Sequence, residues 1–195
     1  MRPLARFTFA SLCLIVLVVI THLSVVLLIP WHAEYHAAER LRHTLESRHA
    51  ELISGPSERG WLPQPDPFVA IAACAFDLAE GPFRFTTHAS PHFHSAAFHT
   101  RGAGAFFALT DRSVEGEVID VQVMTREQQL IEEAIRAEAV DDDEDRRGDG
   151  VVRVIAPEAS GFVTIRVLAP LASLLPRAEE TAQAATCAVI PLDLD

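Results

Sequence analysis

Histidines are the residues of this chain whose type and spacing best suggest chemistry. His92 and His94, two residues apart, would point to the same face of an extended strand, and His99 follows five residues later. Because imidazole nitrogen is a ligand for zinc and copper, His92, His94 and His99 are candidate metal ligands. On a regular strand His99 would face the other side, so it, or Asp111, would have to reach the site from a turn or a neighbouring strand. The alternative is that these histidines are polar side chains of a partly exposed strand.

Other charged groups give weaker signals. Asp111 and Arg112, with Arg101, could pair a carboxylate and a guanidinium at the base of a hairpin, which is more often a structural ion pair than an anion site. The acidic run 141–145 lacks the spaced ligands and internal glycine of a calcium loop, and predicts a solvated loop. The sequence also contains no G-x-S-x-G, H-E-x-x-H or C-x-x-C motif. It therefore predicts no catalytic residue and no cofactor, and it does not favour an enzyme, although it leaves that question open.

A long uncharged segment near the amino terminus predicts a membrane anchor. Residues 7–29 carry no formal charge, and 16 of these 23 residues are Leu, Ile, Val or Phe. As a helix the segment would be about 34 Å long, which is enough to cross a hydrocarbon core of about 30 Å. It ends at Pro30 and Trp31 without a small-x-small cleavage site, so we expect a transmembrane helix over 7–29 and not a cleaved signal peptide.

Charges on either side of this segment predict its orientation. Arg2 and Arg6 favour a cytoplasmic amino terminus over residues 1–6, although Arg40, Arg42 and Arg48 beyond the helix weaken the contrast. We therefore expect a single-pass protein of a bacterial inner membrane with a periplasmic carboxy-terminal domain. Its expected partners are the lipid bilayer and another envelope protein. The net charge of −11 argues against nucleic acid as a partner.

Cysteine usage is compatible with export. Cys13 lies inside the apolar segment, so only Cys74 and Cys187 would be exported. In an oxidising compartment these two could form a disulfide. They could equally be two buried free thiols, because cysteine is among the most buried residue types.

The elements that must position these residues predict an α+β fold. We expect a juxtamembrane helix and a Pro-rich linker over 30–67, followed by a mainly antiparallel, β-rich domain with two helices over 68–195. The expected strands are 83–86, a hairpin of 93–100 and 105–110, 118–123, 151–155 and 162–168, with 68–76 either a strand or a helix. The expected helices are 125–140, which begins with a capping box of Thr125 and Gln128, and 173–187. In the first of these helices, Leu130, Ile131, Ala134 and Ile135 would form an apolar stripe, while Glu132 and Arg136 would face water.

Several stretches of the chain resemble a family of small bacterial membrane-anchored proteins, catalogued as domain of unknown function 1254. The most specific is Cys-Ala-Phe-Asp-Leu-Ala-Glu-Gly-Pro at 74–82; others are Asp-Pro-Phe-Val at 66–69 and Phe-Phe-Ala-Leu-Thr-Asp-Arg at 106–112. The resemblance implies an inner-membrane protein with a periplasmic β-rich domain, and it brings no established activity and no catalytic residues. Relatives tend to have aromatic residues around the strand that holds His92 and His94, which implies that these histidines occupy packing positions.

Two functions therefore remain open. The first is an uncharacterised single-pass inner-membrane protein whose periplasmic domain is an interaction or accessory module. The alternative is a periplasmic ligand-binding domain or metal-assisted enzyme that uses the His-rich hairpin. Convergence of His92, His94, His99 and Asp111 in a deep pocket would favour the alternative, whereas separated and solvent-facing imidazoles would favour the first.

Overall fold

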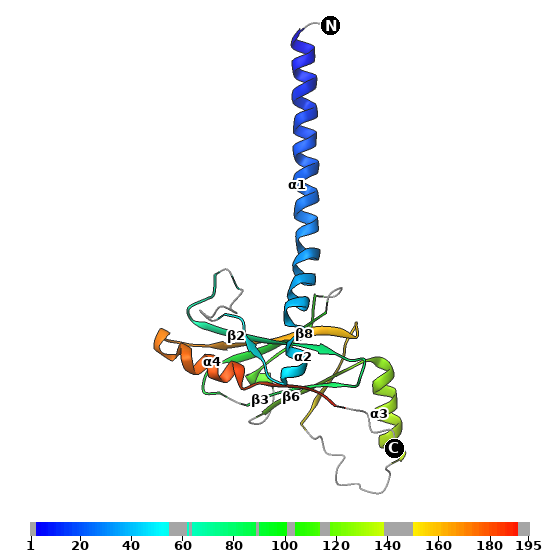
Figure 1. The fold of residues 1–195 in the computed structure, drawn as a ribbon, viewed down its shortest axis with the longest axis vertical. Helices are drawn as coiled ribbons and strands as arrows, with labels where there is room; N and C mark the ends of the chain where they lie inside the picture. The colour runs from blue at the N-terminus through cyan, green and yellow to red at the C-terminus, as the bar shows by residue number, and fades with distance from the viewer. Residues whose placement is uncertain are drawn as a thin grey trace. The chain divides into compact units, whose positions relative to one another are not determined.

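The computed structural model describes residues 3–54, 62, 64–88, 90–100, 104–113, 118–138 and 150–190. The chain divides into two compact units, Met1–Glu39 and Arg40–Asp195. The first consists of most of the long helix α1 (Pro3–Leu41), and the second contains all the strands (Figure 1).

The amino-terminal helix has the length and composition of a membrane span. Ala5–Ile29 is a 25-residue stretch with a mean hydropathy of 3.1, and no residue in its most apolar part is buried. Apolar side chains such as Leu14, Ile15 and Leu27 are more than half exposed. Exposure of this kind costs free energy in water and none in lipid. The helix predicted over 7–29 is therefore confirmed as a helix that could be a membrane anchor or a signal sequence.

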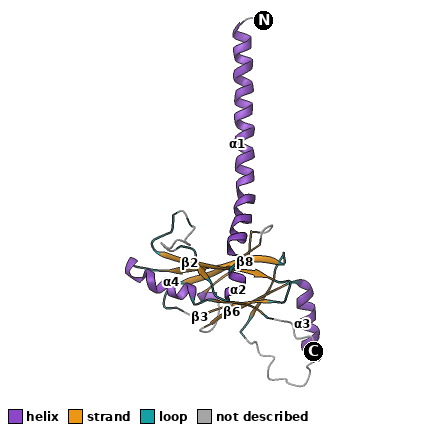
Figure 2. Cartoon of the chain, in the orientation of Figure 1, coloured by secondary structure: helices purple, strands orange, loops and turns teal. Residues whose placement is uncertain are grey.

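Nine strands of the second unit form two sheets (Figure 2). One sheet has the order β1-β2-β8-β4-β5: β1 (Glu51–Leu52), β2 (Val69–Asp77), β8 (Ser160–Leu168), β4 (His94–Thr100) and β5 (Gly104–Thr110). The other has the order β7-β6-β3-β9: β7 (Val152–Ile155), β6 (Val118–Met124), β3 (Phe83–His88) and β9 (Thr186–Val189). Among the strands in the described ranges, only β6 and β7 pair in parallel. The predicted α+β fold with mainly antiparallel sheets is confirmed.

Aromatic side chains from the two sheets meet in one core. The Phe76 and Phe83 rings lie 5.3 Å apart, and the Phe85 and Phe98 rings meet edge to face at 5.7 Å. Phe83 and Phe85 in β3, and Phe98 in β4, alternate with more exposed residues, as the period of a strand requires. Three further helices belong to this unit: α2 (Thr44–Ser47), α3 (Arg126–Glu138) and α4 (Leu175–Gln183). Helix α4 closes part of the core with fully buried alanines.

Strand β2 is buried on both faces, which explains its nearly continuous apolar sequence. Its inner face joins the main core, and its outer face, with Ala73 and Ala75, packs against Leu41 and Ile53. Consequently residues from Arg40 onward pack with the domain that we expected to begin at residue 68. Helix α1 ends at Leu41 and α2 follows over Thr44–Ser47, with Arg48 after it in a left-handed conformation (φ 56°), so no single helix spans the juxtamembrane segment. Most of the expected Pro-rich linker lies outside the described residues.

The carboxy-terminal segment differs from the expected helix 173–187. Helix α4 ends at Gln183, and residues 186–189 form β9, which pairs with β3. The capping box of α3 is confirmed, because the Gln128 backbone donates to Thr125 Oγ1 and the Thr125 backbone donates to Gln128 Oε1. Glu132, expected to face water, instead contacts the sheet. Its carboxylate accepts hydrogen bonds from Arg153 and Gln122.

Candidate functional site

His94 is the one candidate metal ligand that the fold buries completely. It is the first residue of β4 and shares the core-facing side with Ala96 and Phe98. Its Nδ1 lies 3.4 Å from the His92 carbonyl oxygen and 4.0 Å from Asp111 Oδ2. Its Nε2 has no hydrogen-bond partner among the described residues. The fold therefore pairs a buried imidazole with the carboxylate that directly follows β5.

The other candidate histidines do not join this pair. His92 directly precedes Phe93 and β4, and its backbone carbonyl oxygen is the atom that lies 3.4 Å from His94 Nδ1. His99 lies on the opposite face of the sheet, as its odd spacing predicted, and its ring stacks on Phe162 at 4.9 Å. Within the described ranges, no group of three or more His, Cys, Asp or Glu side chains is placed to hold a metal ion. The structure thus brings together His94 and Asp111 alone from the predicted set of His92, His94, His99 and Asp111.

An imidazole hydrogen-bonded to a carboxylate is the arrangement of a general base, but the 4.0 Å between His94 Nδ1 and Asp111 Oδ2 is too long for a hydrogen bond. The imidazole is also 0% exposed, so a dissolved substrate does not reach Nε2 in this structure. Next to His94 and Asp111, the Arg112 guanidinium lies over the Phe93 ring, 5.7 Å from its centre. Phe93 is the residue that directly precedes β4. Arg101 and the acidic run 141–145 lie outside the described residues.

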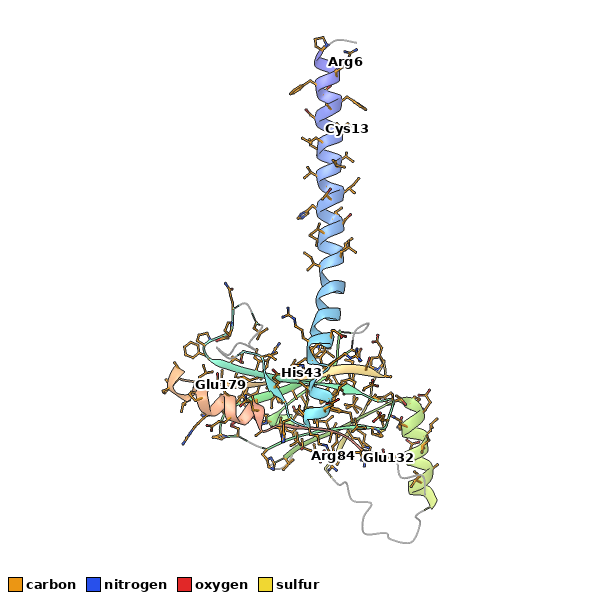
Figure 3. All side chains as sticks on the ribbon, in the orientation of Figure 1. Arg6, Cys13, His43, Arg84, Glu132 and Glu179 are labelled. Atoms are coloured by element: carbon orange, nitrogen blue, oxygen red, sulfur yellow. A yellow bond between two sulfur atoms is a disulfide. The ribbon has the colours of Figure 1, made fainter. Side chains whose placement is uncertain are left out.

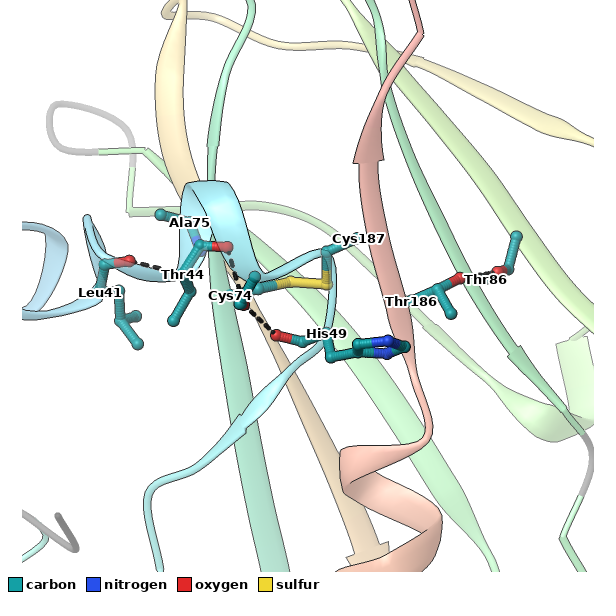
Figure 4. Close-up of a disulfide and its surroundings, with 9 residues drawn as sticks. Leu41, Thr44, His49, Cys74, Ala75, Thr86, Thr186 and Cys187 are labelled. Atoms are coloured by element: carbon teal, nitrogen blue, oxygen red, sulfur yellow. Dashed lines mark hydrogen bonds between the residues drawn. A yellow bond between two sulfur atoms is a disulfide. The ribbon is translucent and has the colours of Figure 1, made fainter.

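Cys74 and Cys187 are joined by a disulfide (Figure 4). Cys74 lies in β2 and Cys187 in β9, so the bond connects the two sheets through the core. The sequence left the bonded and the free-thiol forms open, and the structure contains the bonded form. Next to this bond, β9 is held by the turn after α2, because the Cys187 backbone donates to the Arg48 carbonyl.

Sequence reasoning missed a surface groove of about 500 Å³ beside this turn. His43 and Glu51 share a hydrogen bond there, and Ser47, His49 and Gln183 complete the polar lining. No local signal in the sequence predicts the contact of His43 with Glu51, which lies eight residues further along the chain. The groove is open and both histidines are exposed, so it is a surface feature and not an enclosed site.

Comparison with known proteins places the fold without assigning an activity. No family model and no curated protein matches the sequence. Among solved structures, the VPA0106 protein of Vibrio parahaemolyticus has a TM-score of 0.52 at 11% identity, over 83% of this chain and 34% of that one. An uncharacterised protein of Burkholderia cenocepacia has a TM-score of 0.43 at 9% identity, over 74% of this chain and 35% of that one. The chain therefore spans about a third of the length of these proteins, and the first likeness shows a shared fold.

Proposed function

We propose that this chain is a single-pass protein of a bacterial inner membrane whose periplasmic domain is an interaction or accessory module of the envelope. In this proposal residues 1–6 stay in the cytoplasm and the helix remains attached after export. The lipid bilayer and another envelope protein are the partners. The resemblance to domain of unknown function 1254 supports the same location, and we propose membership of that family.

The disulfide is the observation that carries this location. Disulfides form and persist in oxidising compartments such as the periplasm, and are rare in the reducing cytosol. The bond between Cys74 and Cys187 follows an apolar helix with Arg2 and Arg6 on its short side, which favours translocation of everything after the helix. The two signals are independent, because one depends on the transfer of the helix into lipid and the other on thiol chemistry.

Helix α3 supports the role as an interaction module. Among the side chains of α3 whose burial the structure describes, 126–135, only that of Gln128 is buried, and it donates to the Leu78 carbonyl at 2.6 Å. The predicted apolar stripe is exposed instead: Leu130 is 54%, Ile131 36% and Ile135 42% exposed. A helix that connects two parallel strands normally buries such a stripe against its sheet. A stripe that stays exposed is typical of a surface that a partner covers.

Reporter fusions test the location. Alkaline phosphatase, which folds only after export, and a fluorescent protein, which fluoresces only in the cytosol, would each be joined after Asp195. We expect phosphatase activity without fluorescence, in a product that sediments with membranes. Fluorescence without phosphatase activity would reject the proposed orientation.

Site-specific photo-crosslinking tests the interaction role. A photoreactive residue at Ile131 or Ile135 should form a discrete adduct with an envelope protein. The same residue at Glu133, which is also exposed on α3 but outside the stripe, serves as the matched control. Equal adducts at all three positions, or none at any, would contradict a docking face on this stripe.

A further inference from the structure

The apolar helix has one face with a distinct composition. Starting at Thr8, positions that alternate three and four residues apart carry only β-branched, hydroxyl or imidazole side chains. We call them the seam: Thr8, Ser11, Ile15, Val18, His22, Val25 and Ile29. All leucines of Ala5–Ile29, at 12, 14, 17, 23, 27 and 28, lie off the seam, as do Phe7 and Phe9. Spacing of this kind forms the contact line between two helices that coil around each other.

His22 is the polar group of this seam that most needs a partner. It lies seven residues before Ile29, about 10 Å along the axis inside the span. Within the part of the chain that the structure describes, its ring has no hydrogen bond or ion pair, and Ala5–Ile29 is the only helix that could span a membrane. Ionisable side chains inside a bilayer are costly and almost always face another helix or a polar cavity. A facing helix that packs against His22 would supply the partner that its ring lacks among the described residues.

The helix surface around His22 has the shape that such a partner needs. Val18, Thr21, His22 and Val25 stand at positions i, i+3, i+4 and i+7 and, with Leu17, line a shallow depression. Four residues with this spacing make the hole that receives one side chain of a facing helix. The Thr21 hydroxyl donates to the Leu17 carbonyl at 2.9 Å, so its own hydrogen-bonding need is met within the helix. Side chains project from α1 all around its axis (Figure 3), and the seam is distinguished by residue type alone.

We propose that the seam binds the same seam of a second copy of this chain, with His22 against His22. The inference rests on the proposed function, because it requires the helix to span a membrane. Two copies inserted with the same orientation place their His22 rings at the same depth. A neutral imidazole has one donor and one acceptor, so two such rings can form an N–H···N hydrogen bond with each other. β-Branched neighbours lose little rotamer freedom on packing, which favours the contact further.

Cysteine cross-linking of the full chain in native membranes tests this pairing. In a Cys13→Ala background, Val18→Cys and Val25→Cys place single thiols on the seam, while Ile20→Cys and Leu27→Cys place them on the opposite side. After mild oxidation we expect a band at twice the chain mass for the two seam positions and little or none for the other two. His22→Leu should lower the yield at Val25→Cys by about threefold to tenfold. Ser24→Leu, which removes a polar group off the seam, should leave the yield unchanged.

Three outcomes overturn the pairing: equal yields at all four positions, no cross-link, or adducts only with another protein. Resistance of the chain to alkaline carbonate extraction is measured in the same samples. If the chain stays in the membrane but the seam does not cross-link, the pairing is rejected and the anchor stands. If the chain is released from the membrane, the proposed anchor itself is rejected.

Discussion

Cys74 and Cys187, 113 residues apart in the sequence, are bonded across the core and tie the edge strand β9 to β2 of the facing sheet. Strand β9 has four residues; it pairs with β3, and its Cys187 backbone also donates to the Arg48 carbonyl, so the disulfide adds a covalent connection to these hydrogen bonds. The domain should therefore be most stable where disulfides persist.

Removing this disulfide should destabilise the domain strongly. Closing a loop of this length restricts the unfolded chain, and the double variant Cys74→Ala, Cys187→Ala should lose about 3–5 kcal/mol of unfolding free energy. Denaturant titration of the full chain in detergent measures the loss. Cys13→Ala, which changes the free thiol of α1, serves as the control and should have no effect. An unchanged midpoint in the double variant would show that the bond is not formed.

Thr44 should be essential for the attachment of residues 40–54 to β2. Its buried hydroxyl accepts a hydrogen bond from the Ala75 backbone at 2.7 Å and donates to the Leu41 carbonyl at 2.6 Å. Thr44→Val keeps the shape but leaves the Ala75 N–H without an acceptor, which should cost about 1–3 kcal/mol. Thr44→Ser should restore most of the stability. Thr181→Val removes an exposed hydroxyl of α4 and serves as the control. An equal loss of unfolding free energy in this control would contradict a special role for Thr44.

Gly161 should tolerate no side chain. A Cβ at this position would lie 2.1 Å from the His99 carbonyl oxygen and 2.5 Å from a ring carbon of Phe76. Because backbone and a fully buried ring must move, Gly161→Ala should cost about 2–3 kcal/mol or more. The unfolding midpoint of Ser160→Ala, at the exposed neighbouring position, should stay near that of the wild type. A stable Gly161→Ala variant would show that β8 and β4 do not approach so closely.

Replacing His94 distinguishes a packing role from a role in chemistry. Its Nε2 lacks a described partner, so His94→Leu gives up no hydrogen bond at that atom, and the unfolding free energy should fall by less than about 1 kcal/mol or rise. Phe98→Ala on the same face should cost about 3–5 kcal/mol and calibrates the measurement. If His94→Leu lowered the unfolding free energy as much as Phe98→Ala, the His94 ring would have a stabilising partner that the described residues do not include.

Local patterns predicted much of the fold. The alternation of Phe83 and Phe85 with polar residues identified β3, and the spacing of Thr125 and Gln128 identified the start of α3. Both depend on residues close in sequence. The carboxy-terminal strand β9 was missed because its conformation is imposed by pairing with β3 and by the bond from Cys187 to Cys74, which no local propensity encodes.

The candidate site was less predictable for a related reason. Strand parity correctly separated His99 from the face of His94, whereas Asp111 was named only as a residue that could come from a turn or a neighbouring strand. Parity does not reveal which face the core covers, so the complete burial of His94 and the exposure of Leu130 on α3 emerged only from the packing of the sheets. The contact of His43 with Glu51 depended on a break in the helix that has no sequence signal of its own.

The intact mass of the chain in native membranes tests the central claim most directly. Membranes would be alkylated without reduction, and the purified chain would be analysed by mass spectrometry before and after reduction and a second alkylation. We predict a product that retains the whole apolar helix, in which Cys74 and Cys187 react only after reduction. A chain that begins after Pro30, or one in which both of these thiols react at once, would contradict a membrane-attached domain in an oxidising compartment.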